Sequence, residues 1–123
     1  GQNESANAGV EFSEGDGSVT LQRMTAGNVD NIYVSATDGS DNTKWVTTTE
    51  GELEDTSGTG SPTRKATIGS VGDRITIYNS DPSGGTGNDA GDYYHPDGDV
   101  EKITVIGEVD GSETIIATHE PSN

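Results

Sequence analysis

The residues with the most potential for chemistry lie together in one stretch of the sequence, residues 92–99. This stretch reads Asp-Tyr-Tyr-His-Pro-Asp-Gly-Asp and places three carboxylates and an imidazole close together. Carboxylate oxygens hold hard divalent cations, and Asp97 and Asp99 have the every-second-residue spacing found in calcium-binding loops. The candidate metal ligands are therefore Asp92, His95, Asp97 and Asp99, and the candidate ion is calcium.

A second interpretation of the same stretch needs no ion. The full calcium-loop pattern, D-x-[DN]-x-[DN]-G followed by Glu, does not occur in the chain. With 22 acidic residues among 123, acidic clusters arise by chance, and short acidic turns such as residues 38–42 need no ligand. In this interpretation Tyr93, Tyr94 and Pro96 cover the edge of the core within a solvated loop.

Other kinds of chemistry have little support in the sequence. The chain contains no cysteine, which excludes disulfides, thiolate metal sites and a cysteine nucleophile. There is no G-x-S-x-G motif, and no helix is predicted after the G-x-G-x-x-A pattern at residues 85–90 to hold a pyrophosphate. His119 continues the face of Ile115 and Ala117 in a strand pattern. We expect no enzymatic activity and no bound cofactor.

The elements that must position these residues are predicted to be strands. Val and Ile recur at every second position in short runs bounded by Gly, Asp, Asn or Ser, as in half-buried strands. Helical periodicity is absent, and 18 Gly residues interrupt any helix. We predict an all-β fold, an antiparallel β-sandwich of seven to eight strands over residues 10–120, with an immunoglobulin-like arrangement as one option. Residues 49–62 and 80–99 are predicted to be long acidic loops.

The first nine residues are mostly small and polar, and we predict a flexible tether over residues 1–9. The N-x-[ST] sequon of the chain begins there, at Asn3, which is a candidate glycosylation site if the protein is exported.

The formal net charge of −16 restricts the possible partners. Such a surface repels phosphate backbones and anionic lipid headgroups, so we expect no binding to nucleic acid or to a membrane surface. Self-repulsion of this size is tolerated when molar salt shortens the Debye length to about 3 Å. The acidic residues are spread along the whole chain, which favours a halophilic surface over a single binding patch.

Several segments together resemble the soluble C-terminal β-domain of haloarchaeal type IV pilin-like proteins, the adhesion-pilus subunits related to archaellins. The likeness is carried by Gln-Asn-Glu-Ser-Ala at residues 2–6, Ala-Gly-Val-Glu-Phe-Ser at 8–13, Val-Gly-Asp-Arg-Ile-Thr-Ile at 71–77, and the hairpin over residues 103–118.

This resemblance implies a structural subunit of an extracellular pilus on the cell surface. The subunit would self-assemble into a homopolymeric filament and attach to surfaces or other cells through the loops at 49–62 and 80–99. It also implies a hydrophobic N-terminal helix before residue 1, which would provide the only membrane contact, before assembly. The alternative is a secreted halophilic β-sandwich module of a larger cell-surface protein that binds carbohydrate or calcium.

Overall fold

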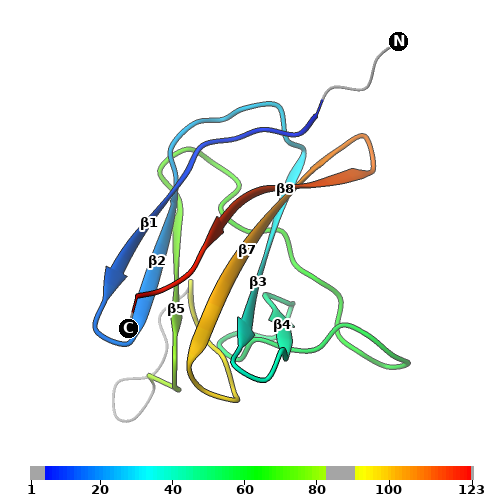
Figure 1. Cartoon of the computed structure of the whole chain (residues 1–123). Coiled ribbons are helices and arrows are strands. Elements are labelled where there is room, and N and C mark those ends of the chain that lie inside the picture. The colour runs from blue at the N-terminus through cyan, green and yellow to red at the C-terminus, as the bar shows by residue number, and fades with distance from the viewer. Residues whose placement is uncertain (1–4, 83–90, 123) are drawn as a thin grey trace.

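The computed structural model describes residues 5–82 and 91–122, in which eight strands form two sheets (Figure 1). The strands are β1 (Val10–Gly15), β2 (Ser18–Arg23), β3 (Asn31–Asp38), β4 (Thr43–Trp45), β5 (Arg74–Tyr78), β6 (Asp92–Tyr94), β7 (Val100–Val109) and β8 (Ser112–His119). One sheet has the order β1-β2-β5-β6 and the other β4-β3-β7-β8. The predicted all-β sandwich is confirmed. The described ranges contain no helix long and apolar enough to cross a membrane.

The core follows from the alternation of Val, Ile and Leu along these strands. Val19 and Leu21 of β2 are buried between half-buried neighbours, because successive side chains of a strand point to opposite faces. They pair with Ile77 and Ile75 of β5 in the same sheet. The other sheet contributes the buried apolar side chains of β3 and β7, which are Ile32, Val34, Ala36, Val100, Ile103 and Val105. Few apolar residues are needed because they share one space between the sheets.

Three pairs of consecutive strands form hairpins among the described residues. β1 pairs with β2, β3 with β4, and β7 with β8, all antiparallel. In the last hairpin, Asp110 and Gly111 have φ values of 51° and 82°. Positive φ at both central residues is typical of the tight turns that match the twist of two paired strands.

Strand β6 differs from the prediction, because it lies within the segment that we expected to be a loop. It pairs with β5 in a parallel direction, and residues 79–91 provide the long connection that parallel neighbours need. The three residues of β6 include no Val, Ile, Leu or Phe, and the buried Tyr93 fills the inward position. An immunoglobulin-like arrangement is not confirmed, because the sheets of that fold are antiparallel.

The predicted loop at residues 49–62 is only partly exposed, and one part of it closes a side of the sandwich. The backbones of Trp45 in β4 and Glu54 exchange hydrogen bonds of 2.7 and 2.9 Å. The backbone of Tyr94 in β6 bonds Leu53 and Gly51 at 2.9 and 2.8 Å. Residues 51–54 therefore join the edges of the two sheets, and this position explains why the Leu53 side chain has no exposed surface.

The opposite side of the sandwich, between β1 and β8, is closed by side chains. The rings of Phe12 and His119 are stacked with their centres 4.8 Å apart. Glu14 accepts hydrogen bonds from the backbone and hydroxyl of Ser122 at 3.1 and 3.0 Å, and its other oxygen lies 2.9 Å from Nε2 of His119. The C-terminal residues are thereby fixed to β1.

The N-terminal segment is held more firmly than its composition predicted. Asn28 donates from its backbone to the Asn7 carbonyl at 3.0 Å, and its side chain accepts from the backbone of Asn7 at 2.8 Å. Gly9 bonds the backbone of Met24 and the hydroxyl of Thr25, both at 2.7 Å. The Ala6 side chain is buried. Residues 5–9 are therefore attached to the domain by hydrogen bonds that composition does not reveal, while the flexible tether over residues 1–9 stays a prediction.

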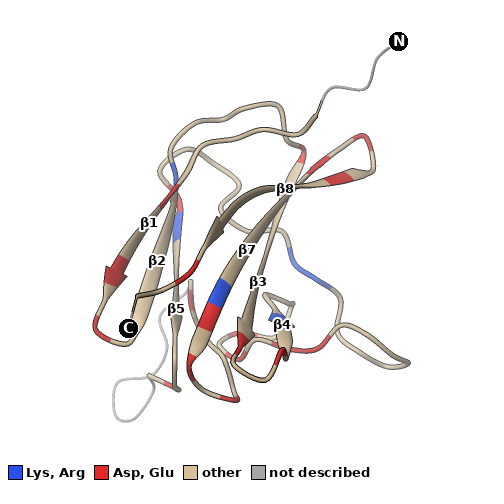
Figure 2. Cartoon of the chain, viewed as in Figure 1, with Lys and Arg blue, Asp and Glu red and all other residues tan. Residues whose placement is uncertain are grey.

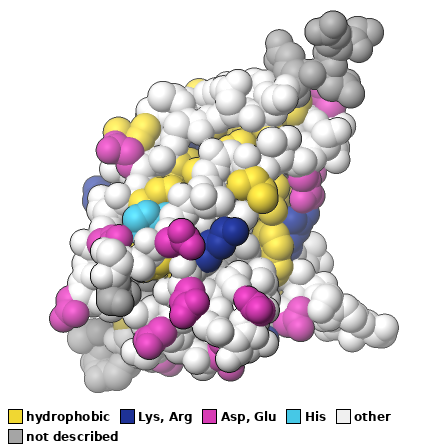
Figure 3. Space-filling view, viewed as in Figure 1, with side chains coloured by type: hydrophobic (Ala, Val, Ile, Leu, Met, Phe, Trp, Pro, Cys, Tyr) yellow, Lys and Arg dark blue, Asp and Glu magenta, His cyan; other side chains and the backbone are white. Residues whose placement is uncertain are grey.

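The turns and loops of the sandwich gather at two opposite ends (Figure 1). The anchor end carries residues 5–9, the segment 24–30, the turn 69–73 and the β7–β8 turn. The acidic end carries the β1–β2 turn, the β3–β4 turn at 38–42, the β6–β7 loop at 95–99 and the C-terminal residues 120–122. Acidic residues are concentrated at the acidic end (Figure 2), and they gather on the lower half of the face in Figure 3. Of the acidic residues that the structure describes, only Asp38 is buried.

Candidate metal centre

Two of the four predicted metal ligands come together at the acidic end, with a third residue that was not predicted. One potential ligand atom each from Asp38, His95 and Asp97 lie within 4.8 Å of one another. Asp92 and Asp99 are not members of this group. Asp92 lies opposite Thr76 in the β5–β6 pair, and Asp99 borders a separate surface hollow.

His95 is the buried centre of this group, with 1% of its surface exposed. The backbone of Asp97 donates a hydrogen bond to Nδ1 at 3.1 Å, so Nδ1 carries no proton. The carbonyl oxygen of Asn42 lies 2.9 Å from Nε2, and a carbonyl can only accept, so Nε2 carries the proton. His95 is thus a neutral imidazole in a defined tautomer, and it connects the β6–β7 loop to the β3–β4 turn.

Asp38 ends β3 and organises the turn that faces His95. Its Oδ1 accepts from the backbones of Ser40 and Asn42 at 2.9 and 2.8 Å, and its Oδ2 accepts from the side chain of Asn42 at 3.1 Å. The backbone hydrogen bond from Asn42 is the largest cause that lowers the pKa of Asp38 below its ordinary value, and these donors together stabilise the ionised form. Asp38 is therefore a buried carboxylate in a fixed orientation.

Asp97 supplies the exposed side of the group. Its backbone is fixed by the bond to His95, and the following Gly98, with φ of 96°, donates to the His95 carbonyl at 3.2 Å. Another carboxylate lies nearby, because a Cβ built on Gly39 would be 3.0 Å from Oε1 of Glu101. The group therefore lies in a region of negative charge, with access to solvent through Asp97.

Sequence reasoning missed Asp38 as a partner of His95. The two residues lie far apart in the chain, Asp38 at the end of β3 in one sheet and His95 directly after β6 of the other, and only the fold brings them together. The available signal was the Asp-Gly-Ser-Asp-Asn turn at residues 38–42, which we interpreted as a turn without a ligand. That interpretation explains the acidic residues of the turn but does not predict that His95 lies beside it.

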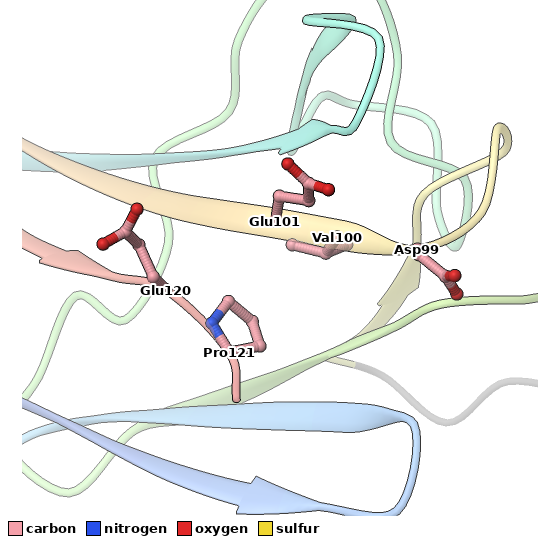
Figure 4. A pocket seen from close by; sticks show the side chains of 5 residues that line it. All are labelled: Asp99, Val100, Glu101, Glu120 and Pro121. Carbon is pink, nitrogen blue, oxygen red and sulfur yellow. The ribbon is translucent and has the colours of Figure 1, made fainter. Parts of the chain in front are cut away.

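A second acidic feature of this end is a hollow of about 500 Å³ between the start of β7 and the C-terminal residues. Its lining residues are Asp99, Val100, Glu101, Glu120 and Pro121. Figure 4 shows that the three carboxylates do not converge, because Asp99 points away from Glu101 and Glu120. The hollow therefore lacks the convergent oxygens of an ion site.

The side chain of Arg64 covers the aromatic rings of Tyr33 and Trp45 in the β4-β3-β7-β8 sheet. The guanidinium carbon of Arg64 lies 4.3 Å from the ring centre of Tyr33 and 4.9 Å from that of Trp45. Arg64 also bonds the Glu113 carboxylate through both terminal nitrogens, at 3.1 and 2.5 Å. A sugar ring that stacked on these aromatic faces would have to displace this cation.

The contact among Glu14, His119 and Ser122 does not have the order of a catalytic triad. In such a triad the histidine bonds both the serine and the acid, whereas here the recorded bonds of His119 and Ser122 both go to Glu14. The arrangement fixes the C-terminal residues and does not activate the Ser122 hydroxyl.

The predicted glycosylation site at Asn3 lies outside the residues that the structure describes. No protein-family model, no curated protein and no solved structure matches this chain.

Proposed function

We propose that this chain is the outward-facing β-domain of a structural subunit in an extracellular type IV pilus-like filament that attaches to surfaces. Its main support is the difference between the two ends of the sandwich. The N-terminal segment is fixed at the anchor end by hydrogen bonds to residues 24–28, while the acidic loops lie at the opposite end (Figure 2). A domain of this form can project its acidic end away from whatever precedes residue 5.

The acidic surface supports the second part of this proposal, which is that the domain works in high salt. The net charge is −16, and the described acidic side chains are exposed or half-buried apart from Asp38. At molar salt this charge is screened over about 3 Å, so that many identical domains can stand side by side. In dilute buffer the same charge would oppose assembly.

Isolation of surface filaments tests this function. Filaments are sheared from cells grown in molar salt, collected by centrifugation and digested, and peptides are identified by mass spectrometry. We expect peptides of this chain as a major component of the pelleted filaments, and an apolar segment of about 20 residues encoded just upstream. Recovery of the peptides only in the soluble supernatant would contradict the proposal.

A second function, the secreted binding module, is favoured by one observation. The group of Asp38, His95 and Asp97 gives this alternative a possible ligand, a metal ion. A binding module for carbohydrate has less support, because Arg64 covers the rings of Tyr33 and Trp45.

A further inference from the structure

We propose that Asp38, His95 and Asp97 form a binding site for a divalent transition-metal ion of the zinc class. This inference does not depend on the filament function, because it concerns the chemistry of one group at the acidic end. It assigns Asp38 as a ligand and leaves Asp92 and Asp99 outside the site.

The first support is the state of the imidazole. Metal-binding histidines almost always donate their second ring N–H to a carbonyl or carboxylate, which fixes the tautomer and leaves the other nitrogen as the ligand. His95 has the same tautomer, because Nε2 donates to the Asn42 carbonyl and Nδ1 is unprotonated, although Nδ1 accepts a hydrogen bond from the Asp97 backbone. Its burial, with 1% of the surface exposed, removes the rotational freedom that a surface histidine would lose on binding.

The second support is the orientation of the Asp38 carboxylate. Three N–H donors hold its two oxygens, two on Oδ1 and one on Oδ2. A carboxylate has about four positions for accepting hydrogen bonds or binding a metal, so one remains. Carboxylate ligands of metals are commonly fixed by hydrogen bonds in this way.

The third support is the spacing of the ligand atoms. One ring nitrogen of His95 and one carboxylate oxygen each of Asp38 and Asp97 lie within 4.8 Å of one another, whereas bonds of about 2.0 to 2.2 Å in tetrahedral geometry place ligand atoms roughly 3.3 to 3.6 Å apart. The required closure is small, and Asp97 can supply it because its side chain is exposed. Water molecules would complete the coordination.

The donor set selects the class of ion. One imidazole nitrogen and two carboxylate oxygens suit Zn²⁺ and the neighbouring divalent transition metals. Calcium takes six to eight oxygen ligands, and a group with two carboxylates and a nitrogen donor is a poor match. The two negative charges also balance the charge of one divalent ion.

Binding has a specific structural consequence at Asp97. A metal at Nδ1 of His95 must replace the hydrogen bond from the Asp97 backbone, which is 3.1 Å long. The amide proton of Asp97 then loses its partner, so its exchange with solvent becomes faster and its NMR signal shifts when zinc is added.

The test is a titration of the folded domain with Zn²⁺ in molar sodium chloride, followed by calorimetry and by the NMR signals of His95 and Asp97. Asp97→Asn removes one exposed ligand and retains the backbone. Asp99→Asn is the matched control, because it makes the same change of charge two positions along the same loop. We expect saturable binding in the original protein and in Asp99→Asn, and an affinity lowered about tenfold or more in Asp97→Asn.

Two results would overturn the proposal. One is the absence of saturable zinc binding in the original protein. The other is an equal loss of affinity in Asp97→Asn and Asp99→Asn, which would mean that the acidic surface attracts the ion without a defined site. Equal or tighter binding of Ca²⁺ would overturn the assigned class of ion. A zinc-dependent rise in melting temperature, present in Asp99→Asn and reduced in Asp97→Asn, provides a second supporting measurement.

Discussion

The two ends of the sandwich are held together by different chemistry. At the anchor end, residues 5–9 are fixed to 24–28 mainly by neutral groups, which are backbone amides, carbonyls, the Thr25 hydroxyl and the Asn28 amide. At the acidic end, the loops are held through the carboxylates of Asp38 and Glu14 and the imidazole of His95. The comparison predicts that the acidic end responds more strongly than the N-terminal attachment to salt, protons and metal ions.

The anchor end also contains a buried cation with neutral partners. The Arg23 guanidinium donates to the carbonyls of Ile68 at 3.1 Å, Thr25 at 3.2 Å and Ala26. These bonds join the segment after β2 to the turn before β5. Because the acceptors are carbonyls, this connection is less sensitive to the titration of acidic groups than the contacts at the acidic end.

Removal of salt is expected to have the largest effect. Below about 1 M salt, repulsion among the carboxylates is no longer suppressed, and we expect the domain to lose structure, beginning at the acidic end. Hydrogen exchange at decreasing salt should show the amides of Asn42 and Asp97 losing protection before those of Met24 and Asn28. Simultaneous loss of amide protection at both ends would show that the two ends do not differ in their response to salt. A circular dichroism spectrum that stays unchanged in dilute buffer would contradict the halophilic interpretation.

The next largest effect is expected from His95→Ala. This change creates a cavity and leaves the Asn42 carbonyl and the Asp97 amide without their partner, at a cost of about 2 to 4 kcal/mol. His119→Ala serves as the matched histidine control, and because His119 is partly exposed its loss should be near 1 kcal/mol. Both values are obtained from denaturant unfolding. An equal cost for the two substitutions would show that His95 is not central to the acidic end.

Gly27→Ala tests the anchor end. Gly27 has φ of 60°, and a Cβ there would lie 1.9 Å from the carbonyl oxygen of Asn7, so residues 5–9 must move away. We expect a loss of about 1 to 2 kcal/mol and faster exchange of the Asn28 amide. Gly17→Ala is the control, because Gly17 has φ of 70° and open space around its Cβ position. If both variants lose the same stability, and the Asn28 amide stays protected, the close contact does not hold the N-terminal segment.

The smallest effect concerns Glu14 and acid. The Ser122 backbone, followed by its hydroxyl and by His119, lowers the pKa of Glu14 below its ordinary value of 4.5. Glu14 therefore contributes stability above pH 4.5, and this contribution is lost as the pH falls through the lower pKa of the folded state. Glu14→Gln should lower stability slightly at neutral pH and flatten its dependence on pH below 4.5. Melting temperatures across this range measure it, and an unchanged slope would contradict the assignment.

The strands could be predicted because their signal is local. Alternation of Val and Ile in short runs predicted half-buried strands such as β5 and β7. β6 and the burial of Leu53 could not be predicted, since both depend on pairing between distant segments, at Tyr94 and residues 51–54. The residues of the candidate site were likewise predictable only where they are close in the sequence. His95 and Asp97 were found because they are neighbours in the sequence, whereas Asp38 joins them only through the packing of two loops.

The central claim is that the acidic end points outward from a filament and the anchor end points inward. The chain has no cysteine, so single cysteines can be introduced at exposed positions of each end, Ser40→Cys in the β3–β4 turn and Val71→Cys in the turn 69–73. Intact filaments of each variant are treated with a bulky maleimide, and labelling is compared with that of the dispersed subunits. The account predicts full labelling of Ser40→Cys and strong protection of Val71→Cys in filaments. Equal labelling at both positions, or protection of Ser40→Cys alone, would contradict it.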